Sequence, residues 1–70
     1  MKSFTQLSKE FKTTGEATIE IKDDISLLIY TDTDGSIGVT NIYHFASADF
    51  YQSFELALEQ LRISFPEIKS

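Results

Sequence analysis

The sequence lacks cysteine altogether and contains only three glycines and one proline among its 70 residues. Without thiols it can form neither disulfides nor thiolate zinc sites, and it has no cysteine nucleophile. Small secreted domains usually depend on disulfides, so we expect a protein of the reducing cytoplasm. None of the glycines stands in a G-x-G context, which argues against a glycine-rich phosphate-binding loop.

Basic residues are also scarce. The chain has 6 lysines and arginines against 11 aspartates and glutamates, which gives a net charge of −5. Such a surface repels phosphate backbones and anionic membranes, so we expect no direct binding to nucleic acid or to a membrane. No apolar run approaches the roughly 20 residues of a membrane span. The first residues, MKSFTQLSKEFK, also lack the apolar segment of a secretory leader.

The composition is nevertheless that of a folded protein. Hydrophobic residues make up 41% of the chain and charged residues 24%, which is typical of globular domains. A chain of this length accommodates one hydrophobic core, so we expect a single domain over residues 1–70.

Residues 3–13 are predicted to form a first helix. Phe4, Leu7 and Phe11 recur at helical spacing and form one apolar stripe. Ser3 and Gln6 have the spacing of a capping box, and Gly15 suits the position just beyond the helix end.

Three strands are predicted next, over residues 17–22, 25–31 and 36–45, with turns at residues 23–24 and 32–35. Short turns join antiparallel neighbours, so the strands form a meander in the order 1-2-3. We favour a register that gathers the apolar side chains on one face over a two-residue Asp34-Gly35 turn. The favoured pairs are Asp32 with Ser36, Ile29 with Val39, Leu27 with Asn41, Ile25 with Tyr43, Ile21 with Ile25 and Ile19 with Leu27.

A second helix is predicted from Ser47 to Phe65, with Asp49 in its first turn and Pro66 ending it. Its apolar stripe comprises Phe50, Phe54, Ala57, Leu58, Leu61 and Phe65. The predicted fold class is therefore α+β, in the order α-β-β-β-α, with a three-stranded antiparallel meander and two helices packed on one face. The alternative is a first helix that is disordered or swapped onto a partner.

Two features of the sequence are candidate sites of chemistry. Residues 30–41 match a calcium loop in part, but Tyr30 and Asn41 stand where the first and twelfth ligands belong, so we expect a plain hairpin turn and no metal. His44 is the single histidine and has no evident catalytic partner. We therefore expect neither an enzyme nor a bound cofactor, with a small hydrolase or isomerase that uses His44 as the remote alternative.

Apolar side chains remain after the core is assigned, and we interpret them as partner-binding residues. Leu28, Tyr30 and Ile42 point to the outer sheet face, and Leu56 and Ile63 lie opposite the core stripe of the second helix. The third strand is expected to leave an open edge, which favours a homodimer.

Acidic residues are concentrated in the middle of the sequence. Residues 16–59 contain nine acidic residues and Lys22 as their only base. The hypothesis is a negative surface that meets a basic partner or imitates nucleic acid. The acidic residues assigned to partner binding are Asp32, Asp34, Glu55 and Glu59.

The α-β-β-β-α order resembles the double-stranded-RNA-binding domain. That family reads RNA with a basic cluster at the start of its last helix, whereas Ser47 to Gln52 contain no lysine or arginine. The resemblance therefore implies the architecture and not the activity. The layout and acidity are also similar to small phage-encoded inhibitors, including anti-CRISPR proteins.

The leading hypothesis is a small acidic, non-enzymatic protein-interaction module that binds itself or a larger protein. The alternative is an acidic inhibitor, a nucleic-acid mimic that blocks a nucleic-acid-binding protein. Binding by a mimic should weaken steeply with salt, whereas binding through an apolar interface should not.

Overall fold

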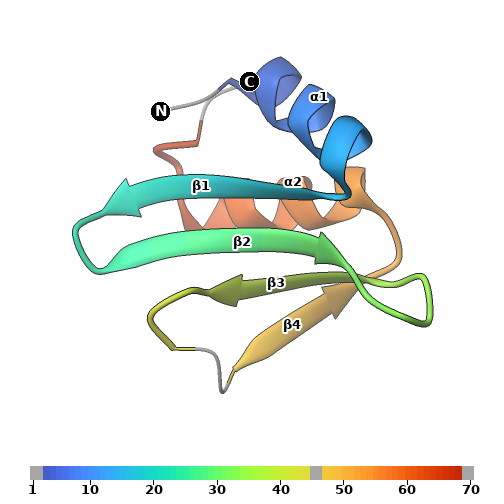
Figure 1. The fold of residues 1–70 in the computed structure, drawn as a ribbon. Helices are drawn as coiled ribbons and strands as arrows, with labels where there is room; N and C mark the ends of the chain where they lie inside the picture. The colour runs from blue at the N-terminus through green and yellow to red at the C-terminus, as the bar shows by residue number, and fades with distance from the viewer. Residues whose placement is uncertain (1–2, 45–46, 69–70) are drawn as a thin grey trace.

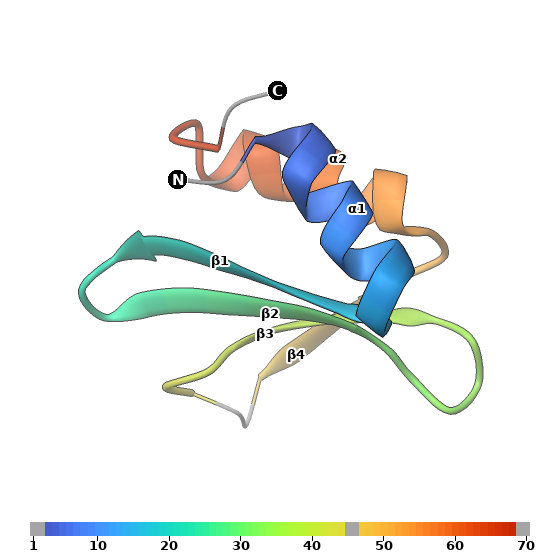
Figure 2. The same cartoon turned by 45° about the horizontal axis from the view of Figure 1, so that its top comes forward.

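A computed structural model of the chain describes residues 3–44 and 47–68 (Figure 1). Its elements are, in order, α1 (Phe4–Thr14), β1 (Glu16–Lys22), β2 (Ile25–Thr31), β3 (Ile37–Asn41), β4 (Ala48–Tyr51) and α2 (Phe54–Ser64). The strands form one antiparallel sheet in the order β1-β2-β3-β4. Both helices lie on the same side of that sheet (Figure 2). The predicted α+β class and meander are confirmed, with a fourth strand added.

The ends of α1 are capped as the sequence predicts. The Ser3 hydroxyl accepts a hydrogen bond from the Gln6 N–H at 3.3 Å, and the Gln6 side chain accepts one from the Ser3 N–H at 2.9 Å. Gly15 follows the helix at φ 82°, a left-handed conformation that favours glycine, and its N–H bonds the Phe11 carbonyl. The chain can therefore turn directly from α1 into β1.

The β2–β3 hairpin has the predicted register. Ile29 pairs with Val39 and Leu27 with Asn41, and the Asp32 N–H donates to the Ser36 carbonyl at 2.8 Å. The strand β3 ends at Asn41, so the expected Ile25–Tyr43 pair does not form. The Asn41 side chain accepts a hydrogen bond from the Tyr43 N–H at 3.0 Å, which stabilises a turn in place of a longer strand.

The β1–β2 hairpin follows the prediction only in part. Ile19 pairs with Leu27 as expected. The predicted Ile21–Ile25 pair is wrong, because an irregularity between Glu20 and Lys22 places Lys22 opposite Ile25. A bulge of this kind leaves one extra residue on one strand and shifts the pairing beyond it.

The predicted start of the second helix at Ser47 is wrong. Residues 48–51 form β4, which pairs with β3, so the expected open edge on the third strand is also wrong. The helix α2 begins at Phe54, where the Ser53 hydroxyl accepts a hydrogen bond from the Leu56 N–H at 3.1 Å. Asp49 and Phe50 therefore belong to an edge strand, and Phe45 lies outside the described residues.

The core lies between the sheet and the two helices. The Phe11 and Phe54 rings stack with their centroids 4.4 Å apart and join α1 to α2. Leu7 of α1 is fully buried in the core, so the alternative of a disordered first helix is wrong. The buried hydrophobic residues are Leu7, Ala17, Ile19, Leu27, Ile29, Ile37, Val39, Phe54, Ala57, Leu58, Leu61 and Ile68.

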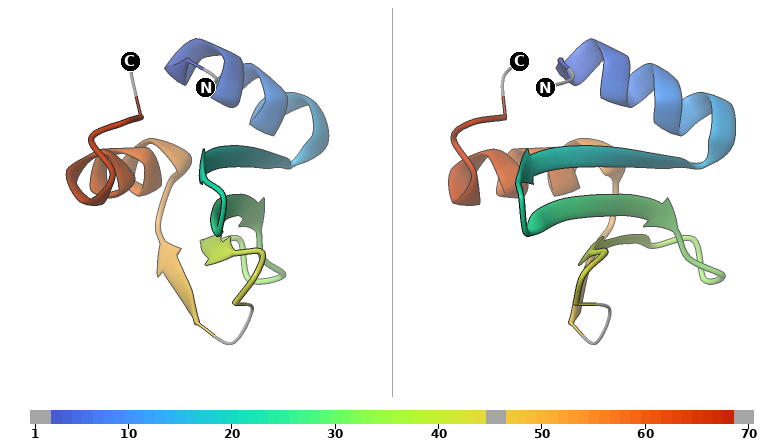
Figure 3. Two further views of the ribbon diagram at one scale, coloured as in Figure 1. Left: turned by 90° about the vertical axis from the view of Figure 1, so that its left-hand side faces the viewer. Right: turned by 60° about the vertical axis from the view of Figure 1, so that its left-hand side comes forward.

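The helix α1 also protects one edge of the sheet. β1 is an edge strand, and edge strands present unpaired N–H groups to other chains. The Glu10 carboxylate of α1 accepts a hydrogen bond from the Thr18 N–H at 3.2 Å. At the other edge, β4 has only four residues. The face of the sheet that points away from α1 and α2 has no described helix over it (Figure 3).

Candidate functional site

The strand register fixes which side chains share the uncovered outer face of the sheet. Side chains alternate between faces along each strand, so residues paired across the strands lie in rows on one face. The first row contains Glu16, Tyr30, Gly38 and Phe50, and the second contains Thr18, Leu28, Thr40 and Ala48. Glu20, Ser26 and Ile42 follow at the far end, where the Ile42 N–H bonds the Ser26 carbonyl.

An aromatic pair occupies the first row. Gly38 has no side chain, and the Tyr30 ring fills the space where one would stand. The Phe50 ring meets Tyr30 edge-on, with their centroids 6.5 Å apart and their planes at 83°. That geometry is favourable for aromatic rings. Phe50 nevertheless remains 52% exposed.

Further apolar side chains extend this pair across the face. Leu28 and Ile42 are half-buried, and Tyr43, in the turn after β3, is 58% exposed. We define the outer patch as Leu28, Tyr30, Ile42, Tyr43 and Phe50. Leu28, Tyr30 and Ile42 are predicted from the sequence for this face, and the structure places them on it.

Tyr43 and Phe50 are not predicted from the sequence for this face, for different reasons. Tyr43 was assigned to the core face because the third strand was extended past Asn41. Phe50 was assigned to the second helix, because it stands four residues before Phe54. An asparagine two residues before Tyr43 was the available signal for a turn.

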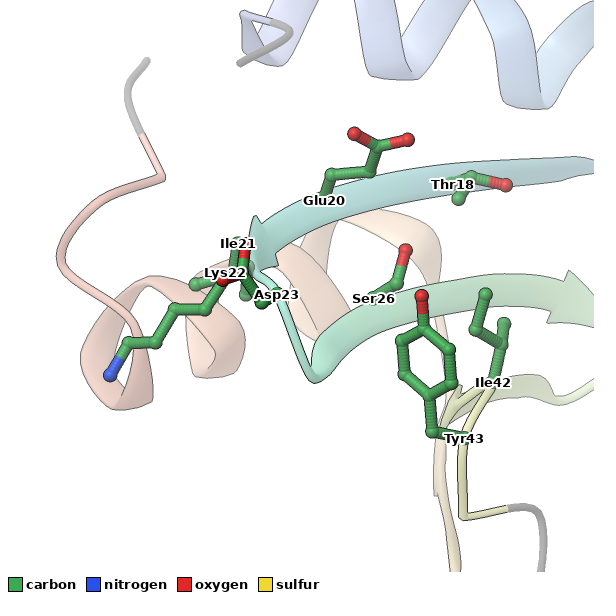
Figure 4. Close-up of a pocket in the computed structure, with 8 residues that line it drawn as sticks. All are labelled: Thr18, Glu20, Ile21, Lys22, Asp23, Ser26, Ile42 and Tyr43. Carbon is green, nitrogen blue, oxygen red and sulfur yellow. The ribbon is translucent and has the colours of Figure 1, made fainter.

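Two shallow hollows border the outer patch. One is lined by Thr18, Glu20, Ile21, Lys22, Asp23, Ser26, Ile42 and Tyr43 (Figure 4). The other is lined by Glu16, Leu28, Tyr30, Thr31, Thr40 and Ala48. Both hollows therefore combine apolar side chains with a carboxylate from β1.

The charge of the outer face is negative. Glu16 and Glu20 are exposed, and the rows defined above contain no lysine or arginine. Lys22 directs its amino group away from the hollow that it lines (Figure 4). No positively charged side chain in these rows would therefore repel a cation that approaches this face.

The other predicted partner-binding residues do not join the outer patch. Leu56 and Ile63 are 37% and 73% exposed on α2, opposite the stripe that faces the core. Glu55 and Glu59 are exposed on the same helix. Because α2 covers the inner face of the sheet, these residues lie on the other side of the molecule (Figure 2).

Asp32 and Asp34 lie in the β2–β3 turn, at one end of the sheet. The Asp34 carboxylate accepts hydrogen bonds from the Ser36 hydroxyl at 2.6 Å and from the Ser36 N–H at 2.9 Å. These donors hold the pKa of Asp34 below its ordinary value. The Asp32 carboxylate accepts a hydrogen bond from the Thr33 N–H. Both carboxylates therefore have partners within the turn.

The candidate catalytic and metal-binding residues do not form a common site in the described part of the chain. His44 is exposed in the turn after β3, and its backbone N–H donates a hydrogen bond to the Asn41 carbonyl. Among residues 3–44 and 47–68, no group of three or more acidic, histidine or cysteine side chains could hold a metal ion.

None of the helices in this described part is long and apolar enough to cross a membrane. Comparison of the chain with protein-family models, curated proteins and solved structures gives no match.

Proposed function

We propose that this chain is a small, non-enzymatic protein-binding module of the cytoplasm and that it holds its partner through the outer patch. The observation that carries the proposal is the cluster of aromatic and aliphatic side chains on the open face of the sheet. Antiparallel sheets with one face in water normally carry polar residues there. Tyrosine, phenylalanine and other large side chains are instead enriched where proteins contact each other.

Charge favours a protein partner over nucleic acid. Aromatic sheet faces that stack bases combine their rings with a positively charged groove. Here the rings share the outer face with Glu16 and Glu20, and the whole chain has a net charge of −5. A protein that presents apolar and basic side chains complements this face better than a phosphate backbone does.

The same charge favours a different protein over a second copy of this chain. Two copies that meet through the outer patch would bring their β1 carboxylates into one interface, where like charges are costly. A homodimer is therefore the alternative outcome of the test. Sedimentation equilibrium separates the two, because self-association through the patch would double the mass of 7.9 kDa and Phe50→Ser would restore the monomer.

The direct test uses a photo-crosslinking residue, p-benzoylphenylalanine, at position 50. The matched control carries the same residue at position 60, which is exposed on α2. We expect crosslinks in the producing cells from position 50 and not from position 60. The crosslinked protein is then purified and titrated with the variants Phe50→Ser and Ile63→Ser. The first should bind at least tenfold more weakly and the second like the parent; equal binding by both would contradict the proposal.

A second candidate function is an acidic inhibitor that blocks a nucleic-acid-binding protein, similar to anti-CRISPR proteins. The favouring observation is that Glu16, Asp32 and Asp34 belong to one end of the sheet. Glu16 pairs with Tyr30 near the end of β2, and the turn with both aspartates follows directly. Under this hypothesis, Asp32→Asn with Asp34→Asn weakens binding more than Phe50→Ser does, and affinity falls steeply with salt.

A further inference from the structure

The hollow beside Tyr43 has a composition suited to a cationic side chain. Tyr43 stands on one side of it, with its hydroxyl group toward Ser26 of β2 (Figure 4). Glu20 and Thr18 lie along β1 on the other side, and the Glu20 carboxylate points away from Tyr43. Ile42 supplies an apolar wall. An aromatic ring, a carboxylate, two hydroxyl groups and an aliphatic wall thus border one space.

The hollow is bordered by two carboxylates that are exposed to solvent. Glu20 and Asp23 are exposed, and the structure gives neither side chain a hydrogen bond or ion pair with another described residue. Lys22 lines the hollow, but its amino group points away from it. Two exposed carboxylates, those of Glu20 and Asp23, therefore border the hollow.

We propose that this hollow receives an arginine side chain of the partner protein. The inference rests on the proposed function and names the chemistry that the partner must bring. A guanidinium group is planar, so its face can stack on the Tyr43 ring. Its edge then donates to the Glu20 carboxylate after the exposed Glu20 side chain rotates toward Tyr43. The aliphatic part of the arginine packs against Ile42. A lysine provides a single point charge and cannot stack in this way.

The position of the hollow links it to the outer patch. Ile42 and Tyr43 belong to both, so an arginine bound here lies next to the apolar contact made through Tyr30 and Phe50. Arginine and aromatic residues often provide the strongest contacts of protein interfaces. The hollow therefore adds a charge-dependent requirement to an otherwise apolar surface.

The test uses small probes and needs no identified partner. Nα-acetyl-arginine methylamide is titrated into ¹⁵N-labelled protein at physiological ionic strength. Nα-acetyl-citrulline methylamide serves as the neutral probe of the same shape, and the lysine analogue as a second cation. We expect saturable amide shifts centred on Ser26, Ile42 and Tyr43 with the arginine probe. The citrulline probe should bind at least tenfold more weakly and the lysine probe severalfold more weakly.

Variants of the protein then identify the contacts. Glu20→Gln and Tyr43→Leu should each weaken arginine binding at least fivefold. Both side chains are exposed, and a dispersed amide spectrum verifies that each variant is folded. Glu59→Gln on α2 makes the same change of charge on the other side of the molecule and should bind like the parent. Equal affinity for the arginine and citrulline probes, or an unchanged affinity in Glu20→Gln, would overturn the assignment.

The outcome also separates this inference from the proposed function. If the arginine probe does not bind but Phe50→Ser still loses the partner, only the arginine pocket is wrong. If partner binding is insensitive to both Phe50→Ser and Glu20→Gln, the partner does not use this face, and both proposals fail.

Discussion

The ring of Tyr30 on β2 occupies the space above Gly38, its cross-strand partner on β3. A Cβ atom built at Gly38 would lie 2.7 Å from the Tyr30 hydroxyl oxygen and 2.8 Å from Cε1. Real Cβ atoms essentially never stand so close to other heavy atoms, so Tyr30 and a larger residue at position 38 cannot both keep these positions. Because Phe50 rests against the same ring, the glycine determines the shape of the outer patch.

We predict that Gly38 and Tyr30 are energetically coupled. With the Tyr30 ring removed, Gly38→Ala should stabilise the fold by about 0.5–1 kcal/mol, because glycine is unfavourable inside a strand. In the parent chain the same change displaces the ring and forfeits an aromatic contact of about 0.5–1.5 kcal/mol. Urea denaturation of the parent, Gly38→Ala, Tyr30→Ala and the double variant measures the coupling. Additive free energies of unfolding would contradict it.

Two leucines on α2, two residues apart, should differ sharply in their contribution to stability. Leu58 is fully buried in the core, whereas Leu56 is 37% exposed on the opposite side of the helix. We expect Leu58→Ala to lower the free energy of unfolding by about 2–5 kcal/mol. Leu56→Ala should cost under about 1 kcal/mol. Thermal or urea denaturation of dilute protein measures both, and equal losses would show that the helix faces are assigned wrongly.

Two serines distinguish the predicted start of the second helix from the observed one. Ser53 caps α2, so Ser53→Ala should cost about 1 kcal/mol of stability. Ser47 precedes β4 and is exposed, so Ser47→Ala should have little effect. Urea denaturation of the two variants compares them directly. A larger loss in Ser47→Ala would restore the helix start expected from the sequence.

The extent to which the fold could be predicted depends on whether a signal is local. The capping box of α1, the Gly15 turn and the β2–β3 register each depend on residues close in sequence, and each was predicted. The strand β4 was not predicted, because four residues are too few to show alternation and Phe50 fits the helical spacing of Phe54. It forms because β3 offers an edge for pairing, and that tertiary contact overrides the local pattern.

The residues of the outer patch show the same division between local signals, which the sequence reveals, and tertiary pairing, which it does not. Leu28 and Tyr30 follow from the parity of β2, which the β2–β3 turn fixes. Tyr43 and Phe50 depend on where β3 ends and where β4 pairs, and neither can be read from residue spacing alone. The division of the predicted partner-binding residues between two sides of the molecule likewise follows from the packing of α2 on the sheet.

The pH response of the β2–β3 turn should depend on Ser36. The Ser36 hydroxyl, 2.6 Å from the Asp34 carboxylate, is the largest cause of the lowered pKa of Asp34, and the Ser36 N–H adds to it. Ser36→Ala should therefore raise the pKa of Asp34 toward its ordinary value without fully restoring it. A ¹³C-detected carboxyl titration measures the change, with Ser64→Ala, an exposed serine on α2, as the control.

The sign of the accompanying stability change follows from the direction of the pKa shift. A carboxyl group whose pKa is lower in the folded chain stabilises the fold above its unfolded pKa, and this contribution is lost as the pH falls through the folded value. The parent should therefore exceed Ser36→Ala in stability at neutral pH, and the difference should shrink under acidic conditions. Urea denaturation at a series of pH values checks this expectation. A difference that grows on acidification would show that the Ser36 hydroxyl does not favour the ionised form of Asp34.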